Sequence, residues 1–198
     1  MAQLRREDLW SLEEYAVKRN EYRAEVMAHK KTRQLALGRH ARLYFEDATT
    51  IRYQIQEMLR IEKTFEAAGI EEELNAYNPL IPDGHNWKAT FMIEFGDPVE
   101  RAKRLREMKG IEDAVWLQVG ESDRITPIAD EDLERENEEK TSSVHFLRFE
   151  LSPAQIGALK GGDELYAGID HAAYPIDKFA VDAIIKQSLT NDLKTTTH

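Results

Sequence analysis

A tight turn between two strand-like runs constrains the fold of this chain more than any other feature. Residues 34–37 and 42–45 both have strand-like apolar patterns, and Gly38 and Arg39 lie in the turn between them. Such a short connection joins antiparallel strands, because parallel strands need a long crossover. Later strand-like runs are separated by helical patterns. The sequence therefore predicts an α+β fold, with an antiparallel or mixed sheet of about five to seven strands and helices packed on it.

Hydrophobic periodicity, capping residues and turn signals predict the remaining elements. The expected helices span residues 9–31, 49–67, 70–76, 98–110, 130–140, 153–161 and 176–189. The expected strands span residues 34–37, 42–45, 88–95, 114–119, 124–128, 144–151 and 165–169. Thr49 or Thr50 is expected to cap the second long helix and Gly69 to end it. The acidic helix over 130–140 is expected to be solvated.

No linker rich in proline, glycine or serine divides the chain, and no repeat of fixed period is visible. A chain of this length normally forms one domain. We therefore expect a single α+β domain over residues 1–192, in which residues 1–32 form a mainly helical N-terminal segment. Residues 193–198 are expected to form a frayed polar tail.

The composition excludes several kinds of site. The chain has no cysteine, which excludes disulfides, thiolate metal sites and cysteine nucleophiles. Its formal net charge is −10, and this acidic character argues against nucleic acid as a partner. No apolar run resembles a signal peptide or a membrane span, so we expect a cytoplasmic protein without a membrane partner.

Sequence motifs leave open whether the protein is an enzyme. The chain has no glycine-rich phosphate loop, no HExxH zinc motif and no GxSxG nucleophile motif. Its histidines are scattered and form no pair with metal-ligand spacing. These absences exclude several common enzyme classes and leave the cofactor unassigned.

The second long helix is the most informative segment for function. Tyr53, Gln56, Glu57 and Arg60 recur at helical spacing and share one face, which Arg52 flanks. Apolar residues cover much of the remaining surface of the helix, which is typical of a buried helix, so the polar stripe can face a pocket. In that case the arginines hold a carboxylate or phosphate, and Glu57 acts as a base or metal ligand. The alternative is a solvated face with an ordinary helical ion pair.

Two further residues complete the predicted ligand-binding set. Asn78 opens the rigid loop 78–84, and such loops often shape binding sites. His145 lies in the strand-like run 144–151, where a lone histidine is more often a packed residue than a ligand. The predicted set is Arg52, Tyr53, Gln56, Glu57, Arg60, Asn78 and His145, and the alternative is a metal site assembled from Glu57, Glu62, His145 and His171.

Four runs of this sequence resemble a bacterial protein family of about the same length. They are Leu9–Tyr15, Tyr53–Glu62, Asn78–Gly84 and Glu131–Phe149, and the resemblance covers nearly the whole chain. The family is domain-of-unknown-function family 3501, which has no established activity. The resemblance implies an association with redox or peroxide metabolism, because genes of the family lie near those of rubrerythrin-like and iron–sulfur proteins. Since the chain has no cysteine, a redox role would need a bound cofactor, a metal or a partner protein.

Three functions are consistent with these features. The favoured one is an accessory or ligand-binding protein that binds a small anion or a redox partner protein. The first alternative is a metal-dependent enzyme with a Glu/His site. The second alternative is a structural homo-oligomer without a small-molecule site, in which the long N-terminal helix supplies a dimer surface. The sequence does not identify the reaction, the ligand or the strand order.

Overall fold

The structure, a computed structural model, describes residues 3–194, and its contacts divide the chain into two compact units. Unit 1 comprises the chain up to Thr32 together with Glu46–Asp83, and unit 2 comprises Arg33–Phe45 and the chain from Gly84 onward. Each unit has its own cluster of buried apolar residues. Within the domain predicted for 1–192, the packing therefore separates into two parts.

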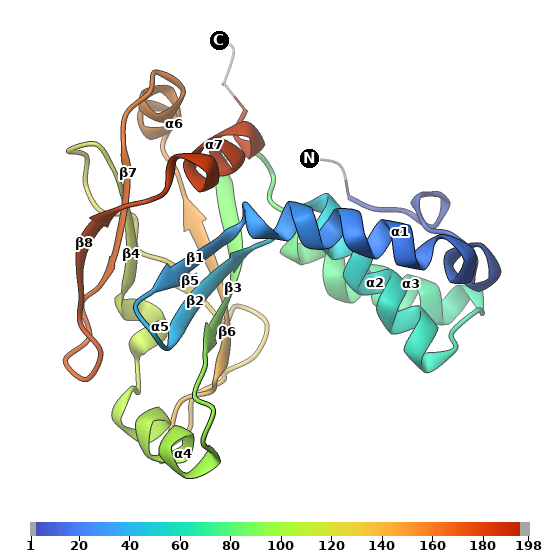
Figure 1. Ribbon diagram of the computed structural model, residues 1–198, viewed down its shortest axis with the longest axis horizontal. Helices are drawn as coiled ribbons and strands as arrows, with labels where there is room; N and C mark the ends of the chain where they lie inside the picture. Colours follow the sequence, from blue (N-terminus) through green and yellow to red (C-terminus); the bar gives the residue numbers. More distant parts are fainter. Residues whose placement is uncertain (1–2, 195–198) are drawn as a thin grey trace. The chain divides into compact units, whose positions relative to one another are not determined.

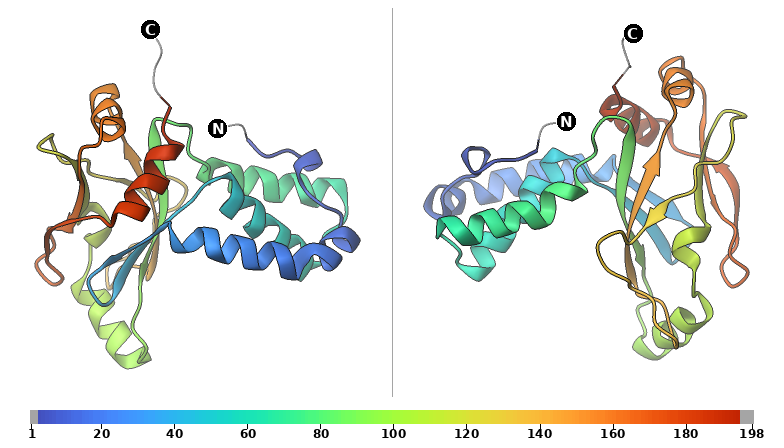
Figure 2. Two further views of the ribbon diagram at one scale, coloured as in Figure 1. Left: turned by 45° about the horizontal axis from the view of Figure 1, so that its top comes forward. Right: turned by 180° about the vertical axis from the view of Figure 1, so that it is seen from behind.

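Unit 1 is helical, and both views of Figure 2 show its three long helices side by side. Its elements are η1 (Arg6–Asp8), α1 (Leu12–Lys31), α2 (Ala48–Glu62), α3 (Ala67–Tyr77) and η2 (Asn78–Leu80). Ile51, Ile55 and Leu59 recur along α2 at helical spacing and pack with Leu74 of α3 in the core of the unit.

The caps of α2 differ from those predicted. Asp47, and not Thr49 or Thr50, is the N-cap: its Oδ1 accepts from Thr50 N at 2.9 Å, and Thr50 Oγ1 accepts from Asp47 N at 3.0 Å. The helix ends earlier than expected, because Lys63 takes a left-handed conformation and its N–H bonds to the carbonyl of Leu59. Gly69, predicted as the C-cap, lies inside α3.

Within the described residues, unit 2 contains two sheets, and their strands pair antiparallel (Figure 1). The larger sheet has the order β1-β2-β3-β6-β5, and the smaller has the order β4-β7-β8. The strands are β1 (Gln34–Leu37), β2 (Ala41–Phe45), β3 (Asn86–Ile93), β4 (Val115–Val119), β5 (Ile128–Ala129), β6 (Val144–Glu150), β7 (Leu165–Ile169) and β8 (Ile176–Ala180). The helices are α4 (Pro98–Glu107), α5 (Ile111–Ala114), α6 (Pro153–Lys160) and α7 (Ala183–Asp192). The predicted α+β class is confirmed.

Both sheets contribute side chains to one hydrophobic core. In the larger sheet Leu43 pairs with Leu35 on one side and with Phe91 on the other, and all three are buried. Phe91 in turn pairs with His145 of β6. Because side chains alternate along a strand, this register turns His145 toward the core together with Leu147 and Phe149.

Two predicted helices are wrong. Residues 130–140 form turns and irregular structure instead of an acidic helix, because the run has no apolar stripe to bury and its polar side chains bond locally. Residues 176–189 divide into β8 and the first part of α7, since Asp182 caps a helix that begins only at Ala183. The strand expected over 124–128 is reduced to β5 and a single bridge between Ile125 and Leu117.

The end of the described chain is tied down. Leu193 is buried, and Lys194 donates its N–H to the carbonyl of Gly84 at 2.8 Å. The rest of the tail predicted to fray, residues 195–198, lies outside the described residues. Among the described residues, no helix combines the length and the apolar character that crossing a membrane requires.

Candidate functional site

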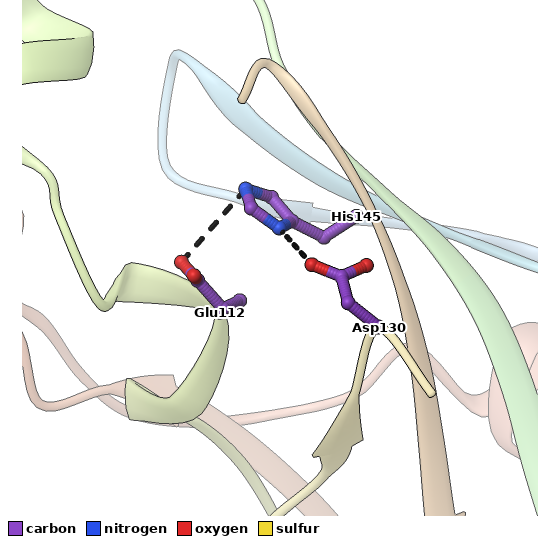
Figure 3. Close-up of side chains that lie close together, drawn as sticks. All are labelled: Glu112, Asp130 and His145. Carbon is purple, nitrogen blue, oxygen red and sulfur yellow. Dashed lines mark hydrogen bonds and ion pairs between the residues drawn. The ribbon is translucent and has the colours of Figure 1, made fainter. Parts of the chain in front are cut away.

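One group of three potential metal ligands, Glu112, Asp130 and His145, lies largely buried beside the larger sheet of unit 2 (Figure 3). Glu112 comes from the short helix α5, Asp130 directly follows β5, and His145 lies on β6. One donor atom of each residue lies within 4.8 Å of the others. In Figure 3 the imidazole ring lies between the two carboxyl groups, with a different nitrogen facing each.

Asp130 fixes the orientation of the histidine ring. Its Oδ2 lies 2.6 Å from His145 Nδ1, and its Oδ1 accepts from the N–H of Phe146 at 2.9 Å and from Arg135 at 3.2 Å. Asp130 has a φ of 48°, which few residues other than glycine, asparagine and aspartate tolerate. This bend at Asp130 places its carboxylate against His145 and Phe146 of β6.

The other ring nitrogen faces three oxygen atoms. His145 Nε2 lies 3.0 Å from Thr141 Oγ1, 3.1 Å from the carbonyl of Ser142 and 3.8 Å from Glu112 Oε2. The Thr141 hydroxyl also lies 3.3 Å from Glu112 Oε2, so it connects the ring to the carboxyl group. Asp130, His145, Thr141 and Glu112 thus form one continuous polar network.

The side chains of this network are shielded from solvent, and this changes the acidity of one carboxyl group. His145 is fully buried, and Thr141 and Glu112 are 1% and 7% exposed. Burial raises the pKa of Glu112, while the neighbouring His145 ring acts in the opposite direction. When the ring donates to both Asp130 and the carbonyl of Ser142 it carries a proton on each nitrogen and is positively charged. In the tautomer that carries its proton on Nδ1 alone, Nε2 can accept a hydrogen bond or bind a metal ion.

A hollow of about 580 Å³ adjoins the network at Thr141. Arg101, Arg135 and Lys140 line it together with Ser142. The volume is within the range of small-molecule sites. Thr141 belongs both to this hollow and to the buried network, so it provides the contact between them.

The other six residues of the predicted ligand-binding set belong to unit 1, whereas His145 belongs to unit 2. The two amides hold the N-terminal segment. Gln56 accepts from the N–H of Trp10 at 2.7 Å and donates to its carbonyl at 3.4 Å. Asn78 forms the same pair of bonds with Leu4, each 2.9 Å long. Tyr53 is buried, with its ring centroid 6.1 Å from that of another tyrosine on α1.

Glu57 forms a compact ion pair with α1. Its carboxylate accepts two bonds from Arg19, of 2.7 and 2.9 Å, and one from the hydroxyl of Tyr15 at 2.7 Å. Arg60 approaches the same carboxylate at 3.4 Å and is largely exposed. The Arg19 guanidinium is the main cause that lowers the pKa of Glu57 to about 2. Within unit 1 this carboxylate holds α1 against α2.

Arg52 is placed differently from the other charged residues of α2. Its guanidinium lies 4.1 Å from the ring centroid of Trp10 and 5.7 Å from that of Tyr22. It also lines a hollow of about 490 Å³ in unit 1. The prediction that Arg52 binds a ligand stays a prediction.

The alternative metal set is divided between the two units, with Glu57 and Glu62 in unit 1 and His145 and His171 in unit 2, and it stays a prediction. Of Glu57, Glu62, His145 and His171, His145 alone belongs to the one group of three potential metal ligands found in the described part of the chain. Glu62 is exposed at the end of α2. His171 has its two ring nitrogens bonded to the backbone, Nε2 to the carbonyl of Lys109 at 2.9 Å and Nδ1 to the N–H of Ala173 at 3.2 Å.

The three residues that accompany His145 in the network carry no sequence signal that links them to it. Glu112, Asp130 and Thr141 precede His145 by 33, 15 and 4 positions, and no motif links such distant residues. Asp130 was assigned to a solvated helix. The only sequence signal was the position of His145 on the strand-like run 144–151, whose aromatic and aliphatic residues indicate burial.

Comparisons with known proteins agree with the family inferred from the sequence. The model of a family described as "Protein of unknown function (DUF3501)" matches residues 3–193. The structure is similar to the crystal structure of a novel protein of unknown function from Burkholderia pseudomallei K96243, with a TM-score of 0.93 and 51% sequence identity. That match covers 98% of this chain and 100% of the other. A search of curated proteins found no match. The chain therefore belongs to the DUF3501 family of proteins of unknown function.

Proposed function

We propose that this protein binds one divalent transition-metal ion through His145 and Glu112, with Asp130 holding the histidine ring. The observation that carries the proposal is the convergence of these three side chains, from α5, from β6 and from the residue after β5, on one largely buried point. Buried carboxyl groups are costly unless a cation or hydrogen bonds compensate them. A divalent ion bound to the Glu112 carboxylate would supply such a cation.

The distances suit a shared ion. Bonds from zinc to imidazole nitrogen and to carboxylate oxygen are about 2.0–2.2 Å long. His145 Nε2 and Glu112 Oε2 are 3.8 Å apart, so both atoms can reach one ion without a large movement. The Thr141 hydroxyl is within 3.3 Å of both atoms and adjoins the neighbouring hollow, which offers a route for the ion and for an exchangeable ligand.

Asp130 has the role that a carboxylate often has behind a metal-bound histidine. A histidine that binds a metal through one nitrogen usually donates its other N–H to a carboxylate or carbonyl, which fixes the ring and makes it a stronger ligand. The 2.6 Å contact between Asp130 and His145 Nδ1 fits this arrangement. Nε2 is then the metal-facing nitrogen.

The donor set also indicates the class of metal. One imidazole with carboxylate and hydroxyl oxygens suits zinc, manganese or iron. Iron or manganese would give this cysteine-free chain the redox centre that the resemblance to its family implies. The redox partner protein and the homodimer inferred from the sequence stay predictions, which native mass spectrometry of the purified protein would test.

Metal analysis tests the proposal directly. The protein is purified from cells grown with added iron, manganese or zinc, and its metal content is measured by plasma mass spectrometry. The metal-free protein is then titrated with Co²⁺, whose visible absorption reports coordination. We expect about one ion per chain. The affinity should be at least about tenfold lower in Glu112→Gln, which removes a ligand, and in Asp130→Asn, which removes the carboxylate that holds the histidine ring.

His171→Gln is the matched control, because it removes a half-buried histidine of unit 2 that lies outside the network. It should bind the metal as the wild type does. Substoichiometric metal after supplementation, together with no Co²⁺ absorption, would rule the proposal out. Equal binding by Glu112→Gln and the wild type would show that the ion is held elsewhere.

A further inference from the structure

Two buried polar atoms in unit 1 lack the partners that such atoms normally have. In the described part of the chain, Tyr22 Oη and Arg52 Nε are the buried side-chain nitrogen and oxygen atoms without a hydrogen bond. Buried polar groups in native proteins are almost always hydrogen-bonded, so each exception needs an explanation. Both residues line the same hollow of about 490 Å³, which we call the Arg52 hollow; Glu7, Asp8 and Thr49 also line it.

The side chains that carry the two donors pack against Trp10 before any ligand arrives. The Arg52 guanidinium stacks over Trp10, and Trp10 contacts Tyr22 edge to face, with ring centroids 4.9 Å apart. Trp10 is fixed in turn by its two backbone bonds to Gln56. Binding by groups that are already ordered loses little conformational entropy.

Both unpartnered atoms are hydrogen-bond donors in the form expected near neutral pH. Arginine has no acceptor, and its Nε–H and the phenol O–H can share the two oxygens of a carboxylate. Burial raises the pKa of Tyr22, although Arg52 acts in the opposite direction, so the phenol keeps its proton. The first turn of α2 borders the hollow at Ala48 and Thr49, and its partial positive charge favours an anionic group.

The acidic residues of the hollow restrict the ligand further. Glu7 is exposed and makes no hydrogen bond or ion pair with any other described residue, while Asp8 accepts from the N–H of Arg5 at 2.8 Å. These carboxylates repel a phosphate or a dicarboxylate and attract an amine. The lining thus carries one positive and one negative region.

We infer that the Arg52 hollow binds a small zwitterion of the α-amino acid class. On binding, the Arg52 and Tyr22 side chains turn their buried donors toward the hollow. The ligand carboxylate then accepts one hydrogen bond from Arg52 Nε and one from Tyr22 Oη, and the ligand ammonium group faces Glu7. This site is separate from the metal site proposed in unit 2, and neither depends on the other.

Thermal shift and calorimetry with defined probes test the inference. The wild type is screened with a panel of free L-α-amino acids, with their N-acetyl derivatives, with the corresponding amines and with inorganic phosphate. At least one free amino acid should raise the melting midpoint, whereas its N-acetyl derivative and its amine should bind at least about tenfold more weakly, as expected when a charged contact is lost.

Three variants link binding to the two donors. Tyr22→Phe removes the hydroxyl and should weaken binding about tenfold without lowering the midpoint of the ligand-free protein, because the hydroxyl has no partner there. Arg52→Lys keeps a cation over Trp10 but lacks the Nε–H, and should weaken binding similarly. Arg60→Met, outside the hollow on the same helix, should bind like the wild type.

Three results would overturn the inference. They are the absence of a midpoint shift with every amino acid of the panel, unchanged binding in both Tyr22→Phe and Arg52→Lys, and tighter binding of inorganic phosphate than of any amino acid.

Discussion

Replacing Glu57 by glutamine tests how unit 1 is held together. The Glu57 carboxylate accepts three hydrogen bonds from α1, two from Arg19 and one from Tyr15, and its pKa falls from an ordinary value of 4.5 to about 2. A shift of that size corresponds to about 3 kcal/mol at neutral pH. The pair is partly open to water, since the Arg19 side chain is 29% exposed, so screening reduces the gain. We expect Glu57→Gln to lower the free energy of unfolding by about 1–2 kcal/mol at pH 7.

The pH dependence of this loss identifies its cause. Because the native pKa of Glu57 lies below its unfolded value, the stabilisation is complete above pH 4.5 and is lost as the pH falls toward 2. The difference between Glu57→Gln and the wild type should therefore be largest at pH 7 and should shrink on acidification. Urea unfolding at each pH measures this difference in the free energy of unfolding. Circular dichroism at 222 nm follows the unfolding, since the helices of unit 1 contribute strongly to that signal.

Glu21→Gln is the control, because Glu21 is an exposed residue of α1 whose side chain makes no ion pair or hydrogen bond with residues 3–194. It should change stability by less than about 0.5 kcal/mol. A loss in Glu57→Gln that is the same at pH 7 and pH 3 would refute the electrostatic explanation. Unchanged stability of Glu57→Gln at pH 7 would also refute this explanation.

Two further predictions concern packing. Gln56→Ala should cost about 2–3 kcal/mol in urea unfolding, because it leaves the N–H and carbonyl of Trp10 without their partner; a loss below about 0.5 kcal/mol would contradict these bonds. Gly168→Ala should cost about 2 kcal/mol or more, because the added Cβ would lie 2.2 Å from Cζ2 of Trp116. Gly157→Ala in α6 is its control: no atom lies within 4 Å of the added Cβ, so the helix should gain about 0.5–1 kcal/mol in the same assay. Equal effects of the two glycine substitutions would contradict the predicted clash.

The elements that were predicted well have strong local signals. The hairpin over 34–45 follows from two apolar runs and a glycine with a φ of 74°, and the strand over 144–150 follows from its dense aromatic and aliphatic residues. The segment 130–140 was predicted wrongly because its polar composition suits an exposed helix. In the fold, Asp130 bonds instead to residues of β6.

The candidate sites were harder to predict, because their residues meet partners that are distant in the sequence. Gln56 and Glu57 look like parts of a pocket wall from helical spacing, but spacing does not reveal the partner across from each side chain. In the structure the partners are Trp10 and Arg19, more than 35 positions away in the chain. His145 was identified as a candidate, but without the carboxyl groups that give it chemical interest.

By itself, the sequence determined the family, the α+β class and the residue types that are available for chemistry. These depend on composition and on patterns within a few residues, which a single chain displays directly. Only the tertiary structure decided which polar side chains meet. The pairing of β5 with β6 brings Asp130 to His145, and the turn into α5 brings Glu112 there from farther away in the chain. Such contacts arise from strand register and the packing of the core, which link residues whose separation in the sequence carries no signal.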